Sequence, residues 1–425
     1  MKKGFYTIMS AQFFSSLADN ALLVAAIEML KTTNAPSWHI PALGPMFALF
    51  YVILAPFLGA FADAVPKGKV MFASNAIKVV GCLMMLFGGH PLLAYAVVGL
   101  GAAAYSPAKY GILTELLPNS QLVKANGWIE GLTILSVIFG YVLGGQLVGP
   151  VISRQLLALD MPLIDTGIRT APESAISVIV FLYAVAAAFN LRIPRTDAPL
   201  QPLAHGVVGL MRDFSSCNAR LWSDKLGQIS LGTTTLFWGI LGNMRFIVFA
   251  WAAAALGYNV TQTSTLVGVL AIGTAAGAIV ASTRMRLDQA TKVIPLGAAL
   301  GLLMIGLNAI TNVWVAAPFL VLLGAVAGFL LVPMNALLQH RGANLMGAGR
   351  SIAVQNFNEQ ACILGLGAFL TGMTKFGLST FTTITAFGLL VTGAMWLIYA
   401  WHKSNGVKYR VELDHLLAIA RSDKH

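Results

Sequence analysis

Charged side chains interrupt the apolar segments of this chain at a few positions, and their chemistry needs an explanation. Asp19, Lys78, Lys109, Arg245 and Glu359 each lie within a run of apolar residues about as long as a membrane-spanning helix. A charge at such depth costs about 2.5–3.5 kcal/mol on insertion scales, and it generally faces a partner or a water-filled cavity. Asp19 lies roughly 20 Å along its helix, and its short side chain cannot reach the membrane surface. These residues are therefore candidates for binding a charged solute inside a membrane.

The composition supports a membrane setting. The 425 residues are 57% hydrophobic and only 10% charged, whereas soluble domains carry about 25% charged residues. Apolar stretches of about 20 residues recur along the chain, each long enough to cross a hydrocarbon core of about 30 Å. The net charge of +11 is spread over the connecting segments, which argues against a nucleic-acid partner. The three cysteines are isolated, so we expect neither a disulfide framework nor a structural metal.

We predict an all-α polytopic membrane protein with twelve transmembrane helices in two six-helix bundles. The expected helices span residues 6–31, 42–64, 69–89, 91–117, 124–149, 173–193, 227–256, 262–283, 292–310, 313–339, 348–372 and 377–402. The expected parts are an N-terminal bundle over 1–193, a cytoplasmic central loop over 194–226, a C-terminal bundle over 227–402 and a cytoplasmic tail over 403–425. Two six-helix halves joined by a long central loop are typical of a major facilitator transporter.

The distribution of basic residues sets the orientation. Most of the 27 lysines and arginines fall in the segments that face the cytoplasm if the N-terminus does. Cytoplasmic loops carry an excess of these residues, so we expect both termini to be cytoplasmic.

The two halves also resemble one another. Three pairs of residues align at offsets near half the chain length: Pro107 with Pro333, Glu130 with Glu359, and Asn20 with Asn243. Matches at equivalent helices predict an internal duplication, which is common in transporter folds.

Lys109 lies in the motif SPAKYG, near the cytoplasmic end of its predicted helix. Pro107 should kink that helix, because proline removes a backbone hydrogen bond and its ring clashes with the preceding turn. The kink would turn Lys109 toward a central cavity, where its charge suits an anionic group. Two structural alternatives stay open: an ion pair with Glu130 at similar depth, and extension of the lysine to the inner membrane surface.

The twelve-helix plan places the first, fourth, seventh and tenth helices around one cavity. Asp19, Lys109 and Arg245 would then share a chamber, with Asn20 and Asn243 beside them. One acid with two bases suits a solute that carries both a phosphate and an ammonium group. A structural ion pair of Asp19 with Arg245 or Lys109 is the alternative. The oxygens of Asp19, Asn20 and Glu359 would also allow a coupling Na⁺ or proton, and we expect no other cofactor.

The loop GAFADAVPKGK resembles the loop motif of major facilitator proteins, in which a glycine is followed by an aspartate and then by basic residues. Gly59, Asp63, Lys67 and Lys69 fit this pattern, while two intervening positions depart from it. We expect a cytoplasmic latch in which Asp63 meets a helix N-terminus or a basic side chain, and close helix packing at Gly59. A solvated loop is the alternative. Structural or gating roles are also expected for Lys78, Glu130, Pro107 and Pro333.

Five motifs carry a specific resemblance: FFSSLADNALL, SPAKYGIL, LVKANG, VPMNALLQ and GAGRSIAVQNFNE. In these the chain resembles the bacterial lysophospholipid transporters of the major facilitator superfamily. The resemblance implies inward movement of lysophosphatidylethanolamine and lysophosphatidylglycerol across the inner membrane, followed by reacylation by a partner acyltransferase/acyl-carrier-protein synthetase. It also implies that Asp19, Lys109, Arg245 and Glu359 matter for transport. One acyl chain would remain in lipid, so the cavity should open sideways to the bilayer.

Two other classes of function were weighed. A drug exporter or an importer of a small hydrophilic solute would share the fold but would need a cavity closed to lipid. A lipid-remodelling enzyme would need catalytic motifs, but no histidine is followed at the fifth position by an acidic residue, as in many glycerolipid acyltransferases. The chain also lacks the GxSxG motif and the phosphate-binding loop of ATPases. We therefore expect no enzymatic activity.

Overall fold

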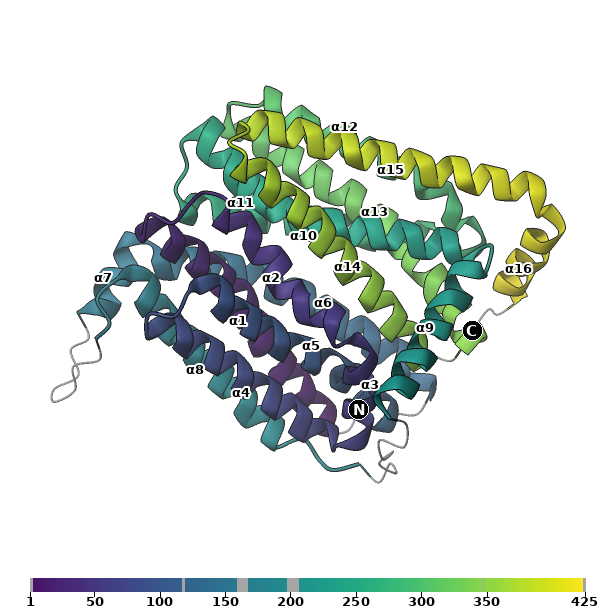
Figure 1. Cartoon of the computed structure of the whole chain (residues 1–425), viewed down its shortest axis with the longest axis horizontal. Coiled ribbons are helices and arrows are strands. Elements are labelled where there is room, and N and C mark those ends of the chain that lie inside the picture. The colour runs from purple at the N-terminus through teal and green to yellow at the C-terminus, as the bar shows by residue number, and fades with distance from the viewer. Residues whose placement is uncertain (1–2, 117–118, 159–166, 197–205, 347, 423–425) are drawn as a thin grey trace. The chain divides into compact units, whose positions relative to one another are not determined.

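The computed structural model describes residues 3–116, 119–158, 167–196, 206–346 and 348–422. Within these ranges the chain is built from helices joined by short connections, and no strand occurs there (Figure 1). The chain divides into two compact units. The first comprises Met1–Val207 with Tyr258–Gly268, and the second comprises Val208–Gly257 with Val269–His425.

The first unit is formed by eight helices along the N-terminal half of the chain. They are α1 (Lys3–Thr32), α2 (His39–Ile53), α3 (Ala55–Ala64), α4 (Lys67–Leu86), α5 (Pro91–Leu116), α6 (Asn119–Val148), α7 (Pro150–Leu157) and α8 (Ala171–Leu191). The helix α1 packs against α6 and α8, and α4 packs against α5 and α8.

The second unit follows the central connection. Its elements are α9 (Val207–Ser223), α10 (Gly227–Leu256), α11 (Val260–Arg284), η1 (Leu287–Val293), α12 (Ile294–Gly306), η2 (Leu307–Ala309), α13 (Val313–Met346), α14 (Ala348–Lys375), α15 (Thr380–Lys408) and α16 (Arg410–Ser422). The part of α11 up to Gly268 belongs to the first unit. Here α10 packs against both α13 and α14, and α12 packs against α15.

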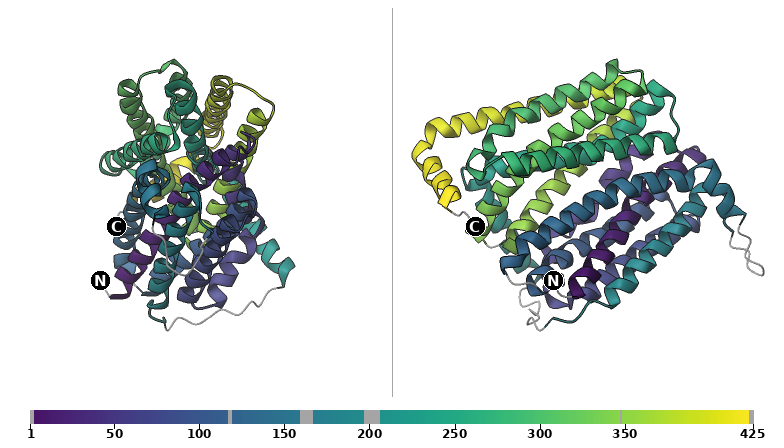
Figure 2. Two further views of the ribbon diagram at one scale, coloured as in Figure 1. Left: turned by 90° about the vertical axis from the view of Figure 1, so that its left-hand side faces the viewer. Right: turned by 180° about the vertical axis from the view of Figure 1, so that it is seen from behind.

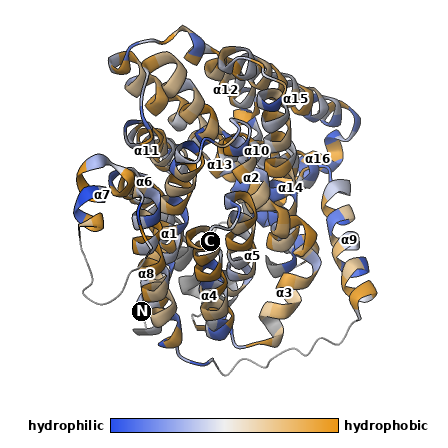
Figure 3. Ribbon diagram, turned by 60° about the vertical axis from the view of Figure 1, so that its left-hand side comes forward, coloured by the Kyte–Doolittle hydropathy of each residue, from blue (hydrophilic) through white to orange (hydrophobic). Residues whose placement is uncertain are grey.

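The helices are long and apolar enough to make the protein multi-pass. Among the described residues, ten helices can span a membrane by length and composition, or eleven if the bent pair α2 and α3 forms one span. Figure 3 shows that these helices are predominantly hydrophobic. The helix α14 is also long, at 28 residues, but it contains the polar run QNFNEQ and falls outside this set. Each of the twelve helices expected from the sequence thus has a counterpart in the structure.

One expected helix is broken. The sequence predicted a continuous helix over 42–64, but the structure contains α2 and α3 with a bend of 64° between them. Pro56 is the second residue of α3, and a proline has no backbone N–H to donate to the preceding turn. Proline is well tolerated in the first turn of a helix, so the chain begins a new helix at this point.

Two segments predicted as loop and tail contain helices. The central stretch 194–226 contains α9, and the stretch 403–425 contains the end of α15 and the helix α16, which turns back at that end of the unit (Figure 2). The prediction failed for α9 because its many polar residues obscured an apolar face. Phe214, Cys217 and Leu221 recur at helical spacing and pack against Leu338 and Val354 in the core of the second unit.

Close contacts with α6 fix the position of α1. A Cβ atom added at Gly140 would lie 2.8 Å from the carbonyl oxygen of Leu17, and one added at Gly144 would lie 2.8 Å from that of Ala21. Any side chain at these positions would therefore push the two helices apart. Small residues let helix backbones approach closely within a membrane, and here they hold the helix that carries Asp19.

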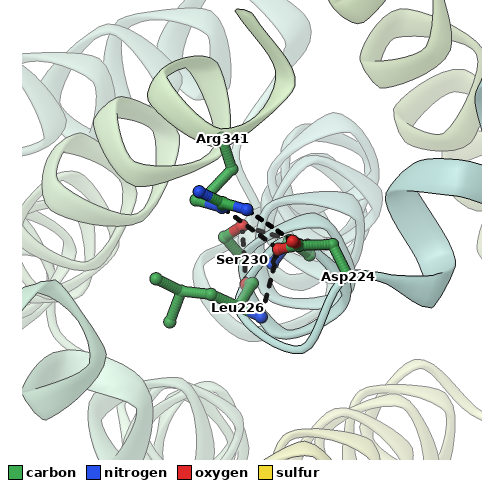
Figure 4. Close-up of polar contacts among 5 residues, drawn as sticks. Asp224, Leu226, Ser230 and Arg341 are labelled. Atoms are coloured by element: carbon green, nitrogen blue, oxygen red, sulfur yellow. Dashed lines mark hydrogen bonds and ion pairs between the residues drawn. The ribbon is translucent and has the colours of Figure 1, made fainter. Parts of the chain in front are cut away.

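A buried ion pair joins three elements of the second unit (Figure 4). Arg341 of α13 donates to Asp224 through Nη2, at 2.5 Å from Oδ2, and through Nε, at 3.2 Å from Oδ1. The same carboxylate accepts the backbone N–H groups of Leu226 and Gly227, at 3.2 and 2.6 Å. Asp224 thus satisfies free donors at the start of α10 while it binds α13, and its negative charge suits a helix N-terminus.

Replacing Arg341 should strongly destabilise the second unit. Arg341→Met leaves the Asp224 carboxylate buried without a counter-charge, and breaking a buried ion pair costs about 3–5 kcal/mol. We expect a clearly lower midpoint of thermal unfolding for the purified protein in detergent. Arg350→Met is the matched control, because the Arg350–Asp213 pair spans 3.6 Å between exposed side chains and such pairs contribute about 0–1 kcal/mol. Equal shifts in the two variants would contradict this assignment.

Candidate functional site

A polar cavity lies among the helices of the first unit. It measures about 100 Å³ and is lined by residues of α1, α2, α4 and α5, including Asp19, Tyr51, Lys78 and Lys109. Three of the charged residues that the sequence placed inside the membrane therefore meet around one small space.

Asp19 forms an ion pair with Lys78. The lysine Nζ lies 2.8 Å from the carboxylate and also donates to Ser15 Oγ at 3.0 Å. The Tyr183 hydroxyl donates to Asp19 Oδ1 at 2.6 Å. The sequence analysis named Arg245 and Lys109 as partners for Asp19 and gave Lys78 only a structural or gating role. The structure instead assigns Lys78 as the direct partner of Asp19.

The Lys78 side chain is buried and is contacted by aromatic rings and a hydroxyl group. Its side chain is 1% exposed, and Nζ lies 5.3 and 5.5 Å from the ring centroids of Tyr105 and Tyr183. Contacts of this kind between a cation and an aromatic ring are attractive. Ser15, which accepts one lysine hydrogen bond, donates in turn to Asn75 Oδ1 at 2.8 Å. The Lys78 ammonium is thus anchored, and its charge is balanced locally by the Asp19 carboxylate.

Lys109 adds the third charge to the cavity. It is 8% exposed and lies two residues after Pro107, which is inside α5. The charged groups that line the cavity are therefore one carboxylate and two ammonium groups. The side chain of Glu130 lies outside the described residues, so its pairing with Lys109 stays a prediction.

Asn20 is directed toward α6. Its Nδ2 donates to the carbonyl of Ser16 at 2.8 Å. Its Cβ would lie 2.7 Å from a Cβ atom added at Gly140 of α6. Asn20 is not among the residues that line the cavity. Consecutive helix residues point in different directions, which explains why Asp19 faces the cavity while its neighbour does not.

The loop motif forms an ion pair that the sequence analysis did not name, while the contact expected of Asp63 stays a prediction. Lys67, the first residue of α4, forms an ion pair with Glu115 of α5, and the Thr196 hydroxyl also donates to Glu115. Lys69 is exposed, and the side chain of Asp63 lies outside the described residues. The expected helix packing at Gly59 is wrong, because an added Cβ there would meet nothing within 4 Å.

The sequence analysis missed Glu115, although the duplication contains a clue to it. Glu115 follows Pro107 by eight residues, and Arg341 follows Pro333 by the same number. Both form buried or partly buried ion pairs at the end of their helices. The aligned prolines therefore mark equivalent positions where each half binds a charged partner of opposite sign.

In the second unit, Arg245 and Asn243 lie on α10. The Arg245 Nε donates to the carbonyl of Gly242 at 3.0 Å, and its guanidinium lies 5.2 Å from the ring centroid of Phe246. Asn243 is fully buried and donates to the carbonyls of Gly239 and Ile363, at 2.8 and 3.2 Å. The Asn243 amide therefore joins α10 to α14, and its expected place beside a solute stays a prediction.

Glu359 belongs to a second polar cluster. It is 7% exposed and accepts a hydrogen bond from Gln355 Nε2 at 2.8 Å. The same nitrogen donates to Asn335 Oδ1 at 2.6 Å, so the cluster joins α14 to α13 two residues beyond Pro333. Gln355 and Asn335 were missed because the search of the sequence considered charged residues first. The chamber shared by Asp19, Lys109 and Arg245 stays a prediction.

The described residues contain no group of three or more His, Cys, Asp or Glu side chains placed to hold a metal ion.

The Asp19–Lys78 pair should behave as one energetic unit. Asp19→Asn leaves the buried Lys78 ammonium uncompensated, and loss of a partner in such a pair costs about 3–5 kcal/mol. Lys78→Met should cost less, because Asp19 is 23% exposed and keeps its bond from Tyr183. The double variant should be more stable than the sum of the two losses predicts, as measured by thermal unfolding in detergent.

Lys69→Met, at an exposed site on the same helix, serves as the control. Strict additivity of the two losses would show that the charges are not coupled.

Comparison with known proteins places the chain. A family model described as Major Facilitator Superfamily matches residues 8–366. The lysophospholipid transporter LplT of Photorhabdus laumondii is 35% identical over 404 residues, covering 95% of this chain and 96% of the relative. The protein of the same name from Pectobacterium carotovorum is 39% identical over 382 residues, covering 89% and 88%.

Solved structures agree with the fold. The nucleoside transporter NupG superposes with a TM-score of 0.69 at 14% identity, covering 95% of this chain and all of that one. A bacterial homologue of the human lysosomal transporter Spinster, inward-facing and unoccupied, gives a TM-score of 0.61 at 16% identity, covering 99% and 98%. Paired helical units, spanning segments and a family match over most of the chain lead to one conclusion: this protein belongs to the Major Facilitator Superfamily.

Proposed function

We propose that this protein transports lysophospholipids across the bacterial inner membrane. The observation that carries the proposal is its 35–39% identity, over 89–95% of the chain, to proteins named lysophospholipid transporter. The cavity of the first unit supports it. A polar space with two lysine ammonium groups in its lining, enclosed by membrane-spanning helices, suits a phosphate that must leave the aqueous headgroup region.

The headgroup phosphate would bind through Lys109. The Asp19–Lys78 pair is neutral as a unit, and Lys109 brings a second ammonium group to the lining of the same cavity. The hydroxyls of Ser16 and Ser106 line the same space and can donate to phosphate oxygens. In this scheme Lys78 holds the Asp19 carboxylate away from the phosphate, to which it would be repulsive. We also assign transport roles to Arg245 and Glu359 in the second unit.

The single acyl chain would remain in the bilayer while the headgroup crosses. This requires a sideways opening between helices and alternating access from the outer to the inner leaflet, where a partner acyltransferase/acyl-carrier-protein synthetase would reacylate the product. Both termini would be cytoplasmic, as the distribution of basic residues indicates. The protein would act as a transporter without catalytic activity of its own.

Lysophospholipid transport would be coupled to a Na⁺ or a proton, and this coupling can be measured. Asp19 is the acidic group of the cavity, and Lys78 and Tyr183 already bind its carboxylate. A coupling Na⁺ or proton would have to compete with the Lys78 ammonium for this site. Uptake measured with and without Na⁺ and a pH gradient tests this directly. The same assay, run with labelled sugars and drugs, tests the alternatives of solute import and drug export.

Loss of Lys109 should abolish transport without loss of the protein. Lys109→Ala removes an ammonium group from the cavity lining, so we expect uptake of labelled lysophosphatidylethanolamine by spheroplasts to fall about tenfold or more, since a charge-assisted hydrogen bond contributes about 1.5–3 kcal/mol. Lys109→Arg keeps the charge and should retain part of the uptake. Membrane abundance is measured by immunoblot in parallel.

The exposed Lys69 provides the control for this experiment, because Lys69→Ala removes the same charge outside the cavity. Normal uptake in Lys109→Ala would exclude phosphate binding by this residue. A fall in membrane abundance equal to the fall in uptake would instead favour a structural ion pair, as with Glu130.

A further inference from the structure

A surface cavity of the second unit lies between α9 and the end of α13. It measures about 510 Å³, which is within the range of pockets that bind small molecules. Leu345 of α13 and Asp224 line it, together with four residues of α9: Ser216, Ala219, Arg220 and Ser223. These four share one face of α9, because residues three, four and seven positions apart lie on the same side of a helix.

The helix α9 is fixed to the bundle of the second unit. Trp222 Nε1 donates to Asn358 Oδ1 at 3.1 Å, and Asn358 Nδ2 donates to Asn218 Oδ1 at 2.8 Å. Cys217 and Leu221 pack into the core of the same unit. The wall that α9 contributes to the cavity is therefore formed before any ligand binds.

The acidic groups on and next to α9 are already paired with arginines of the bundle. Asp224 forms the buried ion pair with Arg341 (Figure 4), and the Asp213 carboxylate lies 3.6 Å from the Arg350 guanidinium. Arg220 is exposed at the cavity, and no carboxylate of the described residues forms an ion pair with it. The Arg220 guanidinium is thus the group of this cavity that can bind an anion.

The cavity lies at the level of the lipid headgroups. The helix α13 has 34 residues, so it is about 51 Å long, whereas the hydrocarbon core of a bilayer is about 30 Å thick. Leu345 is the next-to-last residue of α13, so it lies outside the hydrocarbon core, where phospholipids carry their phosphate groups. A guanidinium offers paired N–H donors that match the oxygens of a phosphate.

We infer that this cavity binds the phosphate group of a membrane phospholipid through Arg220. The hydroxyls of Ser216 and Ser223 donate to backbone carbonyls of α9, and they can rotate to donate to the phosphate oxygens instead. Leu345 and Ala219 provide apolar surface for the glycerol and the first carbons of the acyl chains. With both termini cytoplasmic, as proposed above, the lipid belongs to the inner leaflet. The inference does not depend on which solute the protein transports.

Thermal unfolding of the purified protein in detergent tests the inference, because a ligand that binds only the folded state raises the unfolding midpoint. Three compounds are titrated separately at constant ionic strength: dioleoylphosphatidylglycerol, dioleoylglycerol, which lacks the phosphate, and sodium phosphate, which lacks the lipid. We expect the midpoint to rise with phosphatidylglycerol and to stay unchanged with the other two. An equal rise with dioleoylglycerol or with sodium phosphate would overturn the assignment to a lipid phosphate.

The variant Arg220→Gln assigns the effect to this cavity. Arg220 is exposed, so the variant should unfold at the wild-type midpoint when no lipid is added. The phosphatidylglycerol concentration that gives half of the maximal rise should increase about tenfold or more, because a charge-assisted hydrogen bond is lost. A titration curve identical to that of the wild type would overturn the inference.

Arg212→Gln is the matched control, because it removes the same charge from an exposed position of α9 that does not line the cavity. A general attraction of the lipid to a basic protein would weaken equally in both variants, and equal shifts would therefore also overturn the inference. If Arg220→Gln does not fold, Ala219→Trp takes its place, because it fills the cavity from an exposed position. It should weaken the response to phosphatidylglycerol in the same way, and an unchanged response would contradict the assignment.

Discussion

The free-energy cost of a charge in a low-dielectric membrane shapes this protein more than any other constraint. Three buried cations described above are each paired with a carboxylate from another helix or connection: Lys78 with Asp19, Lys67 with Glu115, and Arg341 with Asp224. These pairs do two things at once. They allow charged residues to exist within the bundles, and they fix which helices must be neighbours. At the cavity, the Asp19–Lys78 pair brings α1 and α4 together beside Lys109 of α5.

The helices could be predicted from the sequence because membrane spans are defined by length and hydrophobicity, which need no knowledge of tertiary contacts. The break between α2 and α3 depends on one backbone junction and was missed for that reason. The helices α9 and α16 were missed because their composition is polar and only one face of each is apolar. For α9, that face becomes visible as a packing surface only when Leu338 and Val354 are present beside it.

The candidate site could be predicted only in part, for a geometric reason. Depth along a helix identified Asp19, Lys78 and Lys109, and all three line one cavity. Depth does not give the direction in which a side chain points. The sequence therefore did not identify Lys78 as the partner of Asp19, and it did not show that Asn20 is absent from the lining of this cavity. Neutral residues such as Gln355 attract no attention in a search for charge. The aligned prolines could have led to Glu115 and Asn335, because each lies at a fixed distance from one of them.

The carboxylate of Asp224 has a consequence for how the chain is made. It caps the start of α10, yet the guanidinium that neutralises it belongs to α13, 117 residues later in the chain. A ribosome completes α10 well before it synthesises Arg341, so the Asp224 carboxylate has no Arg341 guanidinium to pair with when α10 first forms. Packing of α13 then buries the Asp224 carboxylate and supplies its counter-charge. The Asp224–Arg341 ion pair of the second unit can therefore form only late in biosynthesis, and a nascent chain stopped before α13 would lack it.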